Sequence, residues 1–191
     1  MREEQRGQSE TIIEERNLIQ IINLIPMLRK THKYGVILLL FVFLISCDEY
    51  RVFDKYTSVG IDGWKKENLV NFEFEVSDSL ESYDLFIQLR NTSEYQYSNL
   101  FLIAELQYPS GFHVVDTLEY KMTDSYGNWL GDGFTDIKEN KLFYRENFRF
   151  SELGSYQVNI QQAMRNRNDI DGLQSVKGIS DVGFRIEKKE K

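Results

Sequence analysis

The chain has 191 residues, a formal net charge of −7, one cysteine (Cys47) and two histidines. A single cysteine excludes an internal disulfide and a zinc site of the CxxC kind, and the acidic balance argues against a nucleic-acid binder. Hydrophobic residues at 41% and aromatic residues at 14% exclude a disordered chain, and the length suits one domain of ordinary size.

The first predicted element is an export signal. Residues 36–45 (VILLLFVFLI) are apolar throughout, and the basic Arg29, Lys30 and Lys33 come shortly before them. This run is too short to span a hydrocarbon core, which takes about 20 residues as a helix. A basic start, a short apolar run and a small residue at the exit are typical of a signal peptide. An uncleaved signal anchor and a buried core segment are the alternatives.

Residues 44–47 (LISC) resemble the bacterial lipobox, where the signal is cut before a cysteine that carries diacylglycerol. The resemblance predicts a lipoprotein signal peptide at 27–46 and a covalent lipid on Cys47. Residues 1–26 are then an upstream extension, consistent with a start codon assigned too early. Because two acyl chains bind a membrane far more durably than one, such a lipid would anchor the protein.

The mature chain, residues 47–191, is predicted to form a single β domain. It has 25 acidic and 17 basic residues, a net charge of −8, so the acidity belongs to this domain. Apolar and polar residues alternate along it, which indicates antiparallel strands with one face in a shared core. We therefore expect an all-β fold, an antiparallel β-sandwich of about 7–8 strands, Ig-like or jelly-roll-like. The alternating segments are 69–76, 84–91, 100–108, 112–122, 142–150, 156–164 and 182–186.

The connections divide into one tight turn and two long loops. Residues 108–111 (YPSG) predict a type I turn and hence a hairpin between the third and fourth strands. Residues 123–140 and 165–178 are longer than ordinary connections, and a short helix is expected near 169–176. Because a rigid sandwich carries function on its loops, these two are the predicted working surfaces.

The loop at 123–140 provides the candidate site. We assign Trp129, Gly131, Gly133 and Asp136 to a partner-binding loop. Exposed rings at strand ends could stack on sugars or form a protein hot spot, whereas a buried Trp129 would close one end of the core. The aromatic residues in predicted turns or at strand ends are Tyr95, Tyr97, Tyr126, Trp129 and Phe134.

Motifs that would carry catalysis are lacking in the sequence: there is no GxSxG, HExxH, P-loop or GxGxxG. His113 and Asp116 are three residues apart, so on a strand they point to opposite faces. Asp132 and Asp136 could in principle act as a glycosidase pair, and the same loop is rich in oxygen ligands for calcium. Turn formation explains these residues better. We expect no enzyme activity, no metal, no cofactor beyond the lipid, no small-molecule substrate and no nucleic acid.

A series of short motifs runs through the mature chain in order. They are Cys47, 51–54 (RVFD) with Tyr56, 63–64 (GW), 70–74 (VNFEF), 99–102 (NLFL), 116–120 (DTLEY), 128–131 (NWLG) with Gly133, 136–140 (DIKEN), 163–165 (AMR) and 178–184 (GISDVGF). This run is similar to the gliding motility lipoprotein GldH family, over essentially the whole mature chain.

The resemblance implies a non-enzymatic envelope lipoprotein required for gliding motility, in cells that also use the type IX secretion machinery. Its expected partners are the membrane, through the lipid on Cys47, and other envelope proteins of the gliding machinery. It favours the outer membrane, facing the periplasm, with the inner membrane as the alternative. A carbohydrate-binding surface lipoprotein with an aromatic platform around Trp129 is the rival hypothesis.

Overall fold

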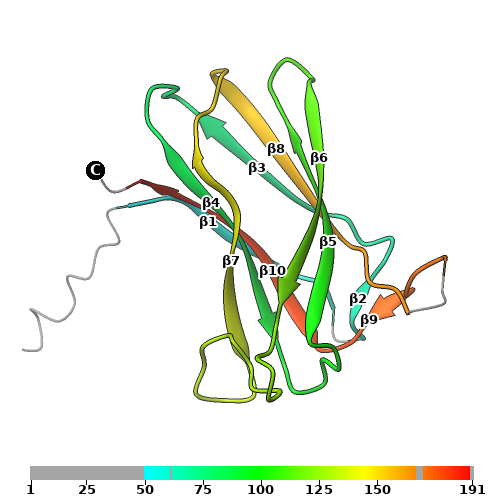
Figure 1. Ribbon diagram of the computed structural model, residues 1–191. Helices are drawn as coiled ribbons and strands as arrows, with labels where there is room; N and C mark the ends of the chain where they lie inside the picture. The colour runs from blue at the N-terminus through cyan, green and yellow to red at the C-terminus, as the bar shows by residue number, and fades with distance from the viewer. Residues whose placement is uncertain (1–49, 61, 167–169, 190–191) are drawn as a thin grey trace, which may run out of the picture. The chain divides into compact units, whose positions relative to one another are not determined.

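Two four-stranded antiparallel sheets make up the domain. The computed structural model describes residues 50–60, 62–166 and 170–189 (Figure 1). The predicted extension at 1–26, the predicted signal peptide at 27–46 and Cys47 lie outside these residues. In the described part, no helix is long and apolar enough to cross a membrane.

The first sheet has the strand order β1-β10-β4-β7 and the second the order β3-β8-β5-β6 (Figure 1). Every strand pair is antiparallel, which confirms the predicted all-β class and a sandwich arrangement. The strands of the first sheet are β1 (Arg51–Ser58), β4 (Tyr83–Asn91), β7 (Lys138–Phe148) and β10 (Ile179–Lys188). Those of the second are β3 (Val70–Val76), β5 (Asn99–Gln107), β6 (His113–Lys121) and β8 (Gly154–Gln162).

Alternating side chains of the two sheets form the core. In β3 every second residue is buried, as the alternation of VNFEFEV predicts. Phe72 and Phe74 of β3 stack on Phe184 of β10, with ring centroids 6.1 and 5.8 Å apart. These rings join one sheet to the other at the centre of the sandwich.

The predicted hairpin turn is confirmed. The Gly111 amide donates to the Tyr108 carbonyl oxygen at 2.9 Å, and β5 pairs with β6 along its whole length. Gly111 has φ +86°, a backbone conformation that residues with a side chain rarely adopt. The backbone conformation that the turn requires therefore explains the glycine at its end.

The helix expected near 169–176 is wrong. Described residues 170–176 contain no helix, and β9 (Ser175–Val176) pairs there with β2 (Trp64–Lys65). Trp64 and Val176 are fully buried, so this small sheet closes the core beyond the ends of the long strands. Burial of these two side chains decides the local structure, and a segment this short has no helical stability of its own to oppose it.

β1 was not among the predicted strands. Of its side chains only Phe53 packs on the core cluster, so the strand shows little alternation. Pairing with β10, in a register that places Tyr56 opposite Gly183, holds it in the sheet.

Candidate functional site

The connection between β6 and β7, residues 122–137, is called here the distal loop. It lies at the bottom of Figure 1, at the end of the sandwich where β4 leads into β5 and β6 leads into β7. All four candidate binding residues of the sequence analysis fall in this loop.

The loop begins with a turn organised by Asp124. One carboxylate oxygen accepts hydrogen bonds from the Tyr126 and Asn128 amides at 2.9 and 2.8 Å, and the other accepts from the Asn128 side chain at 2.9 Å. These hydrogen bonds, that from the Asn128 side chain above all, hold the pKa of Asp124 below its usual value. The carboxylate thus serves the turn, as the preference of Asp for turns predicts.

Trp129 is partly buried and packs against the core. Its ring lies 6.2 Å from that of Tyr95, which is buried, and its backbone bridges to Thr123. The Tyr95 hydroxyl donates to the Asn99 carbonyl oxygen at 2.7 Å, and burial raises the pKa of Tyr95. Trp129 therefore closes one end of the sandwich more than it forms an open platform.

Gly131 and Gly133 allow the loop to lie close to the start of β7. A Cβ on Gly131 would come within 2.6 Å of the Asn140 side-chain oxygen, and one on Gly133 would overlap the Ile137 carbonyl oxygen. The close approach of the distal loop to the start of β7 explains both glycines without a ligand.

Asp136 links the distal loop to the connection between β4 and β5. Its carboxylate accepts a hydrogen bond from the Ser93 amide at 3.2 Å. It also lines a hollow of about 210 Å³ that includes Glu94 and the Gly178 and Ser180 region. Asp136 is thus a candidate residue whose side chain lines a surface hollow.

The distal loop carries several large apolar side chains that the fold leaves exposed. Tyr126 and Phe134 are almost completely exposed, and Leu130 and Ile137 are about half exposed. Exposed aromatic and aliphatic side chains on an ordered scaffold are the usual anchors of a protein–protein contact. Sequence reasoning singled out Tyr126 and Phe134 but not Leu130 and Ile137.

The structure does not bring His113 and Asp116 together as a catalytic pair. His113 is exposed on β6, whereas Asp116 accepts hydrogen bonds from the Tyr144 hydroxyl at 2.9 Å and from Arg145 at 2.5 Å. Burial, with a smaller contribution from Asp116, raises the pKa of Tyr144 to about 12, although the neighbouring Arg145 acts to lower it. Within the described ranges, no group of three or more His, Cys, Asp or Glu side chains is placed to hold a metal ion.

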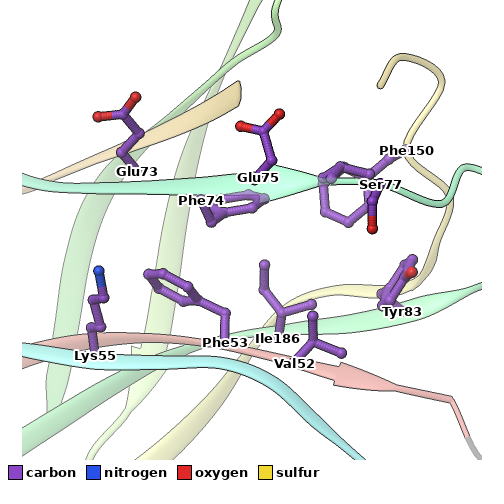
Figure 2. A pocket seen from close by; sticks show the side chains of 11 residues that line it. Val52, Phe53, Lys55, Glu73, Phe74, Glu75, Ser77, Tyr83, Phe150 and Ile186 are labelled. Carbon is purple, nitrogen blue, oxygen red and sulfur yellow. The ribbon is translucent and has the colours of Figure 1, made fainter. Parts of the chain in front are cut away.

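A groove between the edge strands β1 and β3 is the second concave feature. It has a volume of about 340 Å³, and Figure 2 shows Phe53 and Phe74 facing each other across it, with Glu73 and Glu75 directed away. The two rings lie 5.5 Å apart. Aromatic residues of the core thus form the floor of the groove. Of the β1 residues that line it, only Lys55 is charged.

Comparison with known proteins gives a match along nearly the whole domain. The family model described as GldH lipoprotein matches residues 51–186. A gliding motility lipoprotein GldH homolog of Christiangramia forsetii is 53% identical over 82% of this chain and 97% of its own length. The gliding motility lipoprotein GldH of Flavobacterium johnsoniae is 49% identical over 82% of this chain and 96% of its own length. Among solved structures, a family GH115 4-O-methyl-alpha-glucuronidase aligns with a TM-score of 0.40 and 12% identity, over 76% of this chain and 18% of its own.

Proposed function

The chain belongs to the GldH lipoprotein family, and we propose that it is a non-enzymatic lipoprotein that works in gliding motility. The observation that carries this proposal is the 49% and 53% identity with gliding motility lipoproteins over almost their entire lengths. The matches cover 97% and 96% of the relatives' own lengths, so the relatives share the domain that would perform the function.

The anchor of this protein is a lipid on Cys47. The support is the family, whose members are lipoproteins, and the LISC sequence at 44–47. Anchoring places the domain at a membrane of the cell envelope. The outer membrane, on the periplasmic side, is the proposed location, in a cell that also uses the type IX secretion machinery.

The distal loop is the surface proposed to contact other envelope proteins of the gliding machinery. Its backbone is held by the Asp124 turn and by the hydrogen bond between Asp136 and Ser93. Around this frame stand the exposed Tyr126 and Phe134. A rigid loop with exposed aromatic residues loses little conformational entropy on binding, which favours a specific contact. No cofactor or small-molecule substrate is part of this proposal.

Gene deletion and complementation test the proposal. Deleting the gene in its own host should stop colony spreading, and a plasmid with the wild-type gene should restore it. A Cys47→Ser variant should remain uncut, fail to incorporate a fatty-acid analogue and fail to restore spreading. A deletion strain that glides normally would refute the role in motility, and labelling of the Cys47→Ser variant would refute the lipid site.

The carbohydrate-binding alternative depended on a flat ring surface at Trp129. That ring packs against Tyr95, so the sugar hypothesis loses its central residue. Screening the domain on a glycan array tests this alternative directly. If a glycan binds, and the binding is lost in a Tyr126→Ala or Phe134→Ala variant, the carbohydrate-binding hypothesis is supported.

A further inference from the structure

Three exposed apolar side chains occupy three loops at the same end of the sandwich. They are Leu80 in the β3–β4 loop (85% exposed), Phe112 in the β5–β6 loop (61%) and Leu153 in the β7–β8 loop (59%). In Figure 1 these loops run along the top, opposite the distal loop. We call this end, with residues 50–52, 77–82, 108–112, 149–153 and 188–189, the anchor end.

Hydrogen bonds join the loops of the anchor end into one surface. The Lys189 amide donates to the Ser82 carbonyl oxygen at 3.0 Å, and the Arg149 side chain donates to the Ser82 hydroxyl at 3.1 Å. The Ser110 amide and hydroxyl donate to the two carboxylate oxygens of Glu152, each at 2.9 Å. The loops that carry the apolar side chains are therefore fixed to one another and present them together.

The anchor end is also where the chain leaves for Cys47. β1 begins at Arg51, and the Lys188 amide donates to the Tyr50 carbonyl oxygen at 2.8 Å. Cys47 precedes Arg51 by four residues, and four extended residues span at most about 14 Å. A strand such as β4, with nine residues, is about 30 Å long. A lipid on Cys47 therefore keeps the anchor end close to the membrane, and the distal loop lies a strand length beyond it.

We propose that Leu80, Phe112 and Leu153 dock the anchor end onto the lipid surface, so that the domain stands with its distal loop pointing away from the membrane. The proposal rests on the lipid at Cys47 proposed above. Apolar side chains at such a surface enter the boundary between headgroups and acyl chains, about 5–10 Å deep, and the binding strengthens with the apolar area buried. Docking gives these side chains an apolar environment that the fold alone does not provide.

Charge does not drive this contact. The anchor end carries charged side chains of both signs in nearly equal number, namely Arg51, Arg149, Lys188 and Lys189 against Asp78, Glu81 and Glu152. Because neither sign dominates, the docking should form on uncharged phosphatidylcholine and persist at high salt, where attraction to anionic lipid would be screened.

Site-specific labelling tests the docking on the acylated protein in phosphatidylcholine vesicles. Acylation consumes the thiol of Cys47, the only cysteine, so an introduced cysteine is the sole reactive thiol. Leu80→Cys and Leu153→Cys variants, labelled with a polarity-sensitive fluorophore, report on the anchor end, and Phe134→Cys is the matched control in the distal loop. On the vesicles, iodide quenching of the first two labels should fall roughly threefold or more relative to the same labels on residues 48–191 in buffer, which lack Cys47, with a blue shift, whereas Phe134→Cys should not change.

Each outcome decides a separate point. Mass spectrometry first establishes the diacylglycerol, and a protein that lacks it refutes the proposed anchor. If the acylated protein leaves the Leu80 and Leu153 labels as accessible as in buffer, the docking is refuted while the anchor stands. Shielding of the Phe134 label instead would make the distal loop the membrane face. With the label on Phe112→Cys, adding Leu80→Ser and Leu153→Ser should restore quenching, because all three native apolar side chains of the docking surface are then replaced.

Discussion

Phe184 joins the two sheets, and replacing it with alanine should remove a large part of the domain's stability. The ring is completely buried on β10, and its centroid lies within 6.3 Å of those of Phe53, Phe72, Phe74 and Tyr144. Truncating a buried phenylalanine costs about 3–5 kcal/mol, the transfer of the ring plus the cavity left behind. Domains of this size unfold with about 5–15 kcal/mol, so the variant should lose about a fifth of its stability or more.

Urea denaturation of residues 48–191, followed by tryptophan fluorescence, measures this loss. The midpoint should move to lower urea with little change in slope, because the surface exposed on unfolding stays nearly the same. Phe134→Ala is the matched control, since that ring is exposed in the distal loop, and its effect should stay within about 0.5 kcal/mol. If Phe184→Ala costs no more than Phe134→Ala, the contact between the sheets through these rings is refuted.

Three further variants examine single contacts. Tyr144→Phe removes the 2.9 Å hydrogen bond to Asp116 and should cost about 1–3 kcal/mol in urea denaturation, whereas Tyr126→Phe in the distal loop should cost nothing measurable. Gly133→Ala should cost about 1–3 kcal/mol and shift the amide resonances of residues 132–139, because its Cβ would overlap the Ile137 carbonyl oxygen; unchanged spectra would contradict this. Burial tends to raise the pKa of Glu187, but hydrogen bonds from Lys141 and Arg185 outweigh it and hold the pKa below 4.5. This carboxylate therefore stabilises the fold fully above about pH 4.5, and its contribution is lost as the pH falls through the lowered pKa. Lys141→Met should reduce the loss of stability between pH 6 and pH 3, and an unchanged pH profile would refute the pairing.

The strands with one buried face could be predicted because alternation is a local signal. In β3, residues of opposite character succeed one another without a break, and the structure buries every second one. The hairpin at 108–111 was equally predictable, since proline and glycine restrict the backbone to a turn.

In β4, the alternation of the sequence predicts only one of the two faces that are buried. Leu85, Ile87 and Leu89 face the core as predicted, but Phe86 on the opposite face is also buried. The Phe143 ring lies 4.5 Å from that of Phe86, and the Lys141 ammonium nitrogen is 4.1 Å from its centroid. These residues of β7 lie over 50 residues away in sequence, so a strand-by-strand interpretation could not place them over Phe86.

The small sheet and the side-chain contacts of the distal loop were beyond prediction for the same reason. β2 and β9 have two residues each and owe their structure to the burial of Trp64 and Val176. Trp129 was correctly placed in a loop, but its contact with Tyr95 depends on how the β4–β5 and β6–β7 connections meet. Loop position follows from local composition, whereas the direction of a side chain in a loop follows from tertiary contacts.

The two ends of the sandwich carry different connections, and the order of the strands is the reason. An antiparallel fold with β1 beginning at one end must place the β3–β4, β5–β6 and β7–β8 loops at that same end. These three connections are short, and each carries one exposed apolar residue, namely Leu80, Phe112 and Leu153. The opposite end receives the long β6–β7 connection with its hydrogen-bonded turn. A short, apolar end beside the lipid and a long, structured loop a strand length away would let one small domain meet a membrane and a protein partner at once. Exchanging the two roles would require the chain to enter the sandwich from its other end.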